Sequence, residues 1–202
     1  MLNILIWPGI FLFFLLRFES ALRDILANLN ELSLKGAGFE ASMKKEQAAA
    51  TAALAVAASR SSSGATPESA ANAVAAVTPK VIKQARKSTV LWVDDNPAHN
   101  IYERQSLEAL GINFVLASST EEALNKIRKQ DFDAIISDMA RPPDLEAGYT
   151  LLDKLRSSGD RTPFLIYAGS QSPEHVAESK RRGAIGYTNR PDELFAMVLS
   201  VL

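Results

Sequence analysis

The chain has 202 residues, of which 47% are apolar and 22% are charged, and its formal net charge is −1. A chain of this length holds one full α/β domain and a smaller element. The near-neutral charge gives no bulk electrostatic case for binding nucleic acid, and the absence of cysteine excludes disulfides and thiolate metal sites. The charge is unevenly placed, because basic residues predominate before Thr89 and acidic residues predominate from Thr89 onward.

Residues 1–18 form a dense apolar block with no charged side chain before Arg17. A helix over residues 2–16 covers roughly 22 Å of a hydrocarbon core that is about 30 Å thick, and local thinning or snorkelling by Arg17 can make up the difference. A buried core helix is the alternative for a run of this length. The basic n-region and small-residue cleavage site of a cleaved signal peptide are missing. We therefore expect residues 1–18 to be a transmembrane signal anchor.

The flanks of this block predict its orientation. Arg17, Arg23 and Lys35 all follow the apolar run, and no basic side chain precedes it. Positive charge collects on the cytoplasmic side of a membrane span. The sequence therefore predicts a single-pass protein of the cell inner membrane whose bulk faces the cytoplasm.

Residues 19–40 continue with a different spacing. Apolar side chains recur at steps of three and four, which is typical of an amphipathic helix, at Phe18, Leu22, Ile25, Leu26, Leu29 and Leu32. Gly36 and Gly38 are expected to end this helix. The apolar stripe can lie on the lipid bilayer or pair with a second copy of itself. We expect a juxtamembrane amphipathic helix, with a homodimer through residues 18–32 as one hypothesis.

Residues 41–88 are rich in alanine, serine and threonine, and large apolar side chains are scarce. Such a segment buries too little apolar area to offset the entropy lost on ordering the chain. Alanine favours helix, however, and Pro67 after Thr66 is typical of a helix start. We expect an Ala/Ser-rich linker of mixed helix and coil that acts as a tether.

From Thr89 onward, strand-like and helical patterns alternate. Strands are expected at residues 89–93, 113–117, 134–137, 163–167 and 184–187, and helices at residues 100–110, 120–129, 146–157, 173–182 and 191–202. Strands alternating with helices of this length indicate a parallel sheet covered on both faces. We therefore predict an α/β fold over residues 89–202, with a doubly wound, five-stranded parallel sheet.

Three carboxylates follow two of these strands. In LWVDDNP, Asp94 and Asp95 end the first strand, and Asp138 ends the third. An Asp-rich turn is the simple alternative for the adjacent pair. In open parallel sheets, however, functional groups collect at the carboxyl ends of the strands, and the first and third strands are neighbours in the flavodoxin-like order. Carboxylates repel one another unless a cation joins them, and oxygen ligands suit Mg²⁺. We therefore expect a Mg²⁺ site at Asp94, Asp95 and Asp138.

Residues 89–202 resemble a response-regulator receiver domain of the CheY-like superfamily. Asp94 and Asp95 match the acidic pair of that family, and Asp138 matches its phospho-accepting aspartate. Pro142 and Gly148 match the proline and glycine that follow the acceptor. The resemblance implies a flavodoxin-like fold and Mg²⁺-dependent phosphorylation of Asp138 in a two-component phosphorelay, with a histidine kinase or phosphotransfer protein as the donor.

The chain departs from the family pattern at the positions that read phosphorylation. The hydroxyl expected after the fourth strand falls on Ala168, and Ser170 lies two residues later. The family's lysine falls on Arg190, which we expect to contact the phosphoryl group in its place. Tyr187 matches the aromatic residue that reports the conformational switch. The loop after Asp138 also looks two residues longer than usual.

Three hypotheses for function follow. The first is a membrane-anchored receiver-type signalling protein, phosphorylated on Asp138 and acting through protein interaction. The second is a pseudo-receiver that keeps the fold as an interaction module. The third is a membrane effector whose anchor clusters when the soluble domain assembles. We do not expect an enzyme, since neither a glycine-rich phosphate loop nor a Ser-His-Asp arrangement is recognisable, and His99 and His175 have no companion residues.

Overall fold

The computed structural model describes residues 19–202, with their side chains from residue 38 onward. The chain separates into two compact units, Met1–Lys44 and Lys45–Leu202, and each is described by itself. The anchor is expected at residues 1–18, which lie outside the described residues. The apolar stripe is expected at residues 18–32, whose side chains are not described. Within residues 19–202, no helix combines the length and apolar character that a membrane span requires.

Helix α2 (Glu19–Arg60) is the main element of the first unit and continues into the second. It passes through Gly36 and Gly38, which we expected to end it. A glycine in a helix interior costs about 1 kcal/mol relative to alanine. The sequence after Gly38 is rich in alanine, lysine and glutamate, which are strong helix formers. These residues favour helix on the C-terminal side of the glycines, so the prediction of a helix end at this point was wrong.

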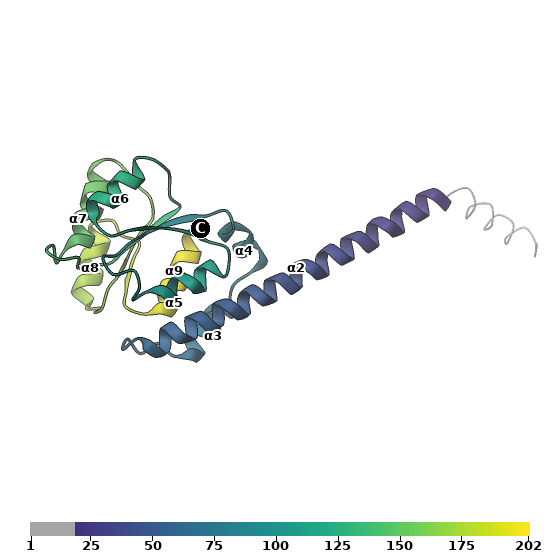
Figure 1. The fold of residues 1–202 in the computed structure, drawn as a ribbon, viewed down its shortest axis with the longest axis horizontal. Coiled ribbons are helices and arrows are strands. Elements are labelled where there is room, and N and C mark those ends of the chain that lie inside the picture. Colours follow the sequence, from purple (N-terminus) through teal and green to yellow (C-terminus); the bar gives the residue numbers. More distant parts are fainter. Residues whose placement is uncertain (1–18) are drawn as a thin grey trace, which may run out of the picture. The chain divides into compact units, whose positions relative to one another are not determined.

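The second unit contains a five-stranded parallel sheet with strand order β2-β1-β3-β4-β5 (Figure 1). The strands are β1 (Thr89–Val93), β2 (Asn113–Ala117), β3 (Ala134–Ser137), β4 (Phe164–Tyr167) and β5 (Gly186–Thr188). The helices between and after them are α5 (Ile101–Glu108), α6 (Thr120–Ile127), α7 (Ala147–Ser157), α8 (Pro173–Arg181) and α9 (Pro191–Val201). This arrangement confirms the predicted five-stranded parallel α/β sheet of flavodoxin-like type.

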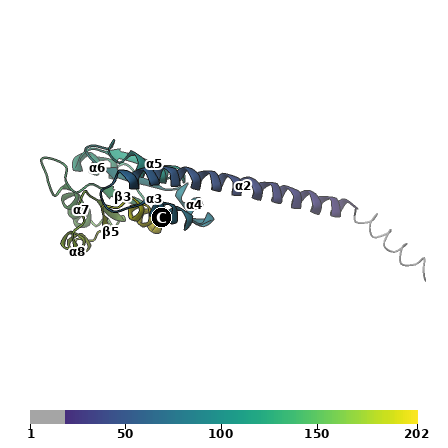
Figure 2. The same cartoon turned by 90° about the horizontal axis from the view of Figure 1, so that it is seen from below.

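Helices cover the sheet on both faces, as the near-continuous apolar strands predict. Helices α6 and α7 pack together on one side, α5 and α9 pack together on the other, and α8 lies beside β5 at the edge of the domain (Figure 2). The central strands are buried, with Leu91, Val93 and Ile135 completely inaccessible to solvent. Trp92 is also buried, and its ring makes edge-on contacts with Phe114 and Tyr167.

The ends of the helices follow local chemistry that is visible in the sequence. The Ser119 hydroxyl accepts the Glu122 N–H at the start of α6, and the Ser172 hydroxyl accepts the His175 N–H at the start of α8. Gly111, in the turn between α5 and β2, has a φ of +95° that disfavours other residues. These signals explain why the predicted and observed bounds of the strands and helices differ by only one or two residues.

Residues 45–88 are helical and packed, which differs from the expected tether. The last four turns of α2 are followed by α3 (Pro67–Ala75) and α4 (Pro79–Ala85), and α3 packs against α9. We call residues 45–88 the N-terminal extension of the receiver-like domain. Its buried apolar residues are Ala50, Leu54, Ala57, Ala58, Ala70, Val74, Val77, Ile82 and Ala85.

The prediction of a tether was wrong because alanine affects helix packing in two opposite ways. Each alanine buries little area, but its small side chain lets helices approach closely, and a few larger residues such as Leu54 and Ile82 then fill the core. Polar contacts also fix the extension. The Gln47 side chain donates to the Val77 carbonyl at 3.0 Å, and Arg86 forms an ion pair with Glu46 at 2.5 Å.

Replacing Leu54 by alanine tests whether the extension belongs to the folded unit. Leu54 is completely buried, so Leu54→Ala should lower the free energy of unfolding by about 2–5 kcal/mol. Val56→Ala is the matched control, because 39% of Val56 is exposed and its truncation should change stability by less than about 0.5 kcal/mol. Urea denaturation followed by tryptophan fluorescence measures both. Equal stabilities of the two variants would mean that the extension is a tether after all.

Candidate functional site

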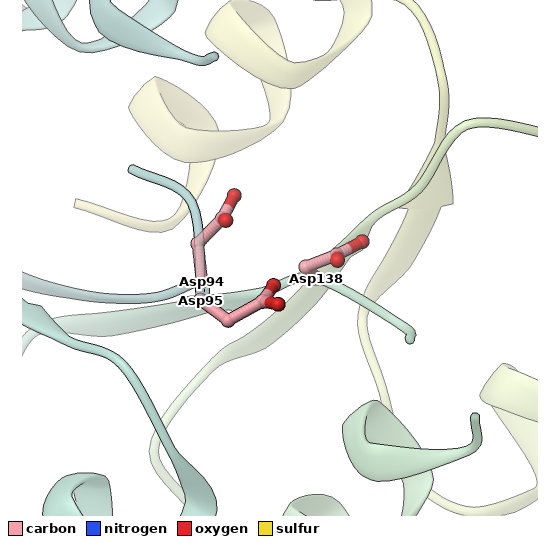
Figure 3. A group of neighbouring side chains, drawn as sticks. All are labelled: Asp94, Asp95 and Asp138. Carbon is pink, nitrogen blue, oxygen red and sulfur yellow. The ribbon is translucent and has the colours of Figure 1, made fainter. Parts of the chain in front are cut away.

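The topology brings the three predicted aspartates together. Asp94 and Asp95 follow β1, and Asp138 follows β3, which pairs directly with β1 so that Val93 lies opposite Ser137. Carboxylate oxygens of all three residues lie within 4.8 Å of one another. Figure 3 shows the carboxylate of Asp95 directed toward that of Asp138 at this edge of the sheet.

Hydrogen bonds hold two of the three carboxylates in place. Asp94 is buried, and its carboxylate accepts the Asn96 backbone N–H at 2.7 Å and the side-chain amide of Asn100. The half-buried carboxylate of Asp138 accepts the Met139 N–H at 2.8 Å. Asp95 is exposed. The cluster therefore presents two constrained carboxylates and one that is open to solvent.

Gly148 fits closely behind Asp138. Its N–H donates to the Met139 carbonyl at 2.9 Å, and a Cβ at this position would lie only 3.0 Å from the Asp138 carbonyl oxygen. A larger residue would push the backbone that carries Asp138. The glycine singled out in the sequence is therefore required by close backbone approach.

The environment disfavours ionisation of Asp138. Burial raises the pKa of Asp138 to about 6, and the neighbouring Asp94 and Asp95 charges act in the same direction. The Met139 N–H and the Arg141 guanidinium oppose this shift only in part. A cation at the cluster would relieve the repulsion.

The donor set fits a hard divalent cation. All three groups offer oxygen, they come from two rigid strand ends, and Asp95 leaves one side open to water. Mg²⁺ prefers a few carboxylates combined with retained water molecules. Asp94, Asp95 and Asp138 are therefore the residues that would hold Mg²⁺.

Arg141 is a site residue that the sequence did not single out. Its guanidinium is buried and donates to the Ser137 hydroxyl and the Asp138 carbonyl, both at 2.6 Å, and to the Thr120 hydroxyl and the Ala147 carbonyl, both at 2.9 Å. It thereby ties the end of β3 to the starts of α6 and α7. The sequence signal that could have pointed to Arg141 is its position in the longer loop after Asp138.

The Arg190 guanidinium is engaged in ion pairs. The Arg190 guanidinium forms ion pairs with Asp192 at 2.7 Å and Glu193 at 3.2 Å, both on α9. It also approaches the Gly64 carbonyl in the N-terminal extension at 3.5 Å. The cationic side chain that acts on the Asp138 carboxyl group in this structure is Arg141. Contact between Arg190 and a phosphoryl group stays a prediction.

Of the expected switch residues, Tyr187 lies on β5, and Ala168 and Ser170 lie in the loop after β4. Tyr187 is buried in the core, and Ala168 packs against the same cluster. The Tyr187 hydroxyl lies 3.4 Å from Nδ1 of His175 on α8. Burial raises the pKa of Tyr187, and a hydrogen bond with Ser170 opposes that shift. Ser170 therefore faces Tyr187, whose side chain is already buried in the core.

Comparison with known proteins identifies the family. The model of the response regulator receiver domain matches residues 90–199. The chain belongs to this family. Receiver domains accept phosphoryl groups from histidine kinases or phosphotransfer proteins, bind Mg²⁺ at the phosphorylation site and act in two-component systems. Asp94, Asp95 and Asp138 all lie within the matched residues.

Individual relatives support this assignment. The chain is 30% identical over 102 residues to the transcriptional regulatory protein ZraR of Escherichia coli, covering 50% of this chain and 23% of the relative. The chain thus spans about a quarter of that protein. Among solved structures, chemotaxis response regulator CheY4 of Vibrio cholerae is 31% identical with a TM-score of 0.50, covering 57% of this chain and 98% of that one. A Francisella receiver domain is 29% identical with a TM-score of 0.51, covering 56% and 95%.

The raised pKa predicts how Asp138 affects stability. An acid whose pKa is 3.8 in the unfolded chain and about 6 in the folded protein destabilises the fold as pH rises through this range. Asp138→Asn removes that penalty. Because Asp138 is only partly buried, we expect a gain of about 1 kcal/mol, or roughly 2–4 °C in melting temperature.

Melting curves in EDTA at pH 7.5 and at pH 4 measure the effect. The gain should be complete at pH 7.5 and much smaller at pH 4, where the carboxyl group is protonated in the folded protein and about half protonated in the unfolded chain. Asp131→Asn, at an exposed aspartate just before β3, is the control and should show no such pH dependence. A gain of equal size at both pH values would contradict the proposed repulsion.

Proposed function

We propose that this protein is a membrane-anchored receiver-type signalling protein that is phosphorylated on Asp138 and signals through protein interaction. The observation that carries the proposal is the convergence of Asp94, Asp95 and Asp138 at the carboxyl edge of the sheet. A histidine kinase or a phosphotransfer protein is the proposed donor.

The chemistry requires an ionised and accessible Asp138. One carboxylate oxygen attacks the phosphorus of a phosphohistidine, a P–O bond forms, the P–N bond breaks, and the leaving imidazole nitrogen takes up a proton. The Met139 N–H donates to one oxygen of the Asp138 carboxylate. Arg141 donates to the backbone carbonyl of Asp138 and so holds the backbone of this residue in place. Mg²⁺ bound by the three aspartates would supply charge neutralisation.

Acyl-phosphate formation on the purified full chain tests the proposal. Incubation with Mg²⁺ and radiolabelled acetyl phosphate should label the chain, and Asp138→Asn should abolish the label. Asp95→Ala should lower the apparent Mg²⁺ affinity at least ~10-fold, which corresponds to about 1.4 kcal/mol of ligation. Asp131→Asn serves as the matched control and should be labelled normally. Retention of label by Asp138→Asn would exclude Asp138 as the acceptor.

The second candidate function is a pseudo-receiver that acts as an interaction module. Two observations favour it: Ala168 offers no hydroxyl to a phosphoryl group, and the Arg190 guanidinium is paired with acidic residues on α9. A folded chain that takes up no label from acetyl phosphate, and an unchanged Mg²⁺ affinity in Asp95→Ala, would together favour the pseudo-receiver over the phosphorylated receiver.

Restoring the hydroxyl tests how phosphorylation is transmitted. In Ala168→Thr, a hydrogen bond from the new hydroxyl to the phosphoryl group should contribute roughly 1.5–3 kcal/mol and shift a two-state population about ten-fold to a hundred-fold. Hydrogen exchange of α8 and β5 should then respond more strongly to phosphorylation than in the parent. Ala177→Thr on α8 controls for adding a hydroxyl elsewhere. Equal responses of the parent and Ala168→Thr would mean that the missing hydroxyl does not limit the switch.

We further propose that residues 1–18 anchor the chain in the inner membrane with the receiver domain facing the cytoplasm. The proposal rests on the uncharged run before Arg17 and the basic residues after it. The bilayer is then a partner, and residues 18–32 are available for a homodimer. A membrane effector that clusters its anchors is the remaining alternative for this segment.

Deletion of residues 1–18 tests the anchor. The truncated chain should move from the membrane pellet to the supernatant after an alkaline wash, because it lacks the long apolar run. A chain carrying Arg161→Gln, far along the sequence from the anchor, should stay in the pellet. Retention of the truncated chain in the pellet would place the membrane attachment elsewhere.

A further inference from the structure

His175 lies in the first turn of α8 and joins this helix to two other elements. Its backbone N–H donates to the Ser172 hydroxyl at 3.2 Å, and its carbonyl accepts the hydroxyl of Tyr149 on α7, also at 3.2 Å. The centre of its ring lies 5.8 Å from the centre of the Tyr187 ring on β5, with the two planes tilted by 38°. The sequence offered no companion residue for this histidine, whereas the fold supplies two tyrosines.

The Tyr187 hydroxyl requires an acceptor, because only 3% of this residue is exposed. Burial raises the pKa of Tyr187, and the hydrogen bond with Ser170 opposes that rise. A hydrogen bond that favours the phenolate is one donated to its oxygen, so the Ser170 hydroxyl is the donor. The Tyr187 proton is then available to Nδ1 of His175, which lies 3.4 Å away and accepts it in the tautomer protonated on Nε2.

The hydrogen-bonded series runs from Ser170 through Tyr187 to His175. It connects the loop after β4, strand β5 and the start of α8. The Gln171 side chain donates to the Tyr187 carbonyl at 3.4 Å and adds a second link between this loop and β5. Movement of the Tyr187 ring out of the core would therefore break its contacts with both Ser170 and His175.

We propose that His175 is a positioning residue that keeps the Tyr187 ring in the core by accepting a hydrogen bond from its hydroxyl group. The ring leaves the core only when this bond is broken, so the start of α8 and β5 respond together. One consequence rests on the proposed function of Asp138: His175 sets the resistance that phosphorylation has to overcome before Tyr187 moves. The link itself is a property of the unphosphorylated domain.

Substitutions of His175 separate this role from a merely structural one. Alanine favours helix more strongly than histidine or asparagine does, and the latter two are nearly equal. If His175 matters only as a helical residue, alanine should give α8 the strongest protection against hydrogen exchange. If Nδ1 accepts from Tyr187, alanine should give the weakest protection, because it offers no acceptor. Asparagine places its Oδ1 close to the position of Nδ1 and should substitute for histidine.

Hydrogen exchange of the unphosphorylated full chain in EDTA measures the protection of α8 and β5. His175→Ala should lower it roughly two- to tenfold, the range expected of one neutral hydrogen bond, and His175→Asn should keep most of it. Tyr187→Phe retains the ring without the hydroxyl and should lower the protection by a similar factor. Combining Tyr187→Phe with His175→Ala should add little, because both remove the same bond.

Lys180→Ala, at an exposed position on the same helix, is the matched control and should leave the protection of β5 unchanged. Unchanged or higher protection in His175→Ala would overturn the proposal, and so would an equal loss in His175→Asn or independent effects of the two substitutions. Labelling of Asp138 is measured separately, so a failure of the proposed function leaves this result interpretable.

Imidazole ¹⁵N spectra of the full chain give a second readout, since the chain has only two histidines. Tyr187→Phe should shift the Nδ1 signal of His175, because the ring stays and only the hydroxyl is lost. The signals of His99, before α5, should stay in place. An unmoved His175 signal would overturn the proposal.

Discussion

Mutual repulsion among Asp94, Asp95 and Asp138 is the constraint on which the architecture of the site depends. Three carboxylates whose oxygens lie within 4.8 Å of one another destabilise any fold that holds them, and burial of Asp94 and Asp138 adds to that cost. The sheet keeps the groups together by pairing β1 directly with β3. Amide N–H groups from Asn96, Asn100 and Met139 then offset part of the charge.

The compensating positive charge lies beneath the acceptor. Arg141 approaches through the backbone carbonyl of Asp138 and is fully enclosed by the loop it organises, whereas Arg190 is occupied by acidic residues on α9. An enclosed guanidinium with four fixed acceptors is a rigid support. It can hold Asp138 in position while leaving the open side of the cluster free for a cation.

Much of the fold could be predicted because its signals are local. The strands are short apolar runs, and three of the helices, α6, α8 and α9, have serine or proline at their starts. The aspartates follow strand ends that the parallel topology brings together. The packing of residues 45–88 could not be predicted, because an alanine-rich helix is compatible with both a solvated and a buried state. The placement of Arg141 and Arg190 was also inaccessible, since a long side chain reaches several partners and tertiary geometry decides among them.

The buried residues of the N-terminal extension also bear on how this receiver domain can be exchanged between proteins. The family match begins at Val90, but Val74, Ile82 and Ala85 lie before that point and are excluded from solvent in the same compact unit. A receiver cut at the family boundary would leave behind these buried apolar side chains, and α9 would lose its neighbour α3. The folded unit of this chain is therefore longer than the family domain, and a chimera that takes α9 has to carry α3 with it.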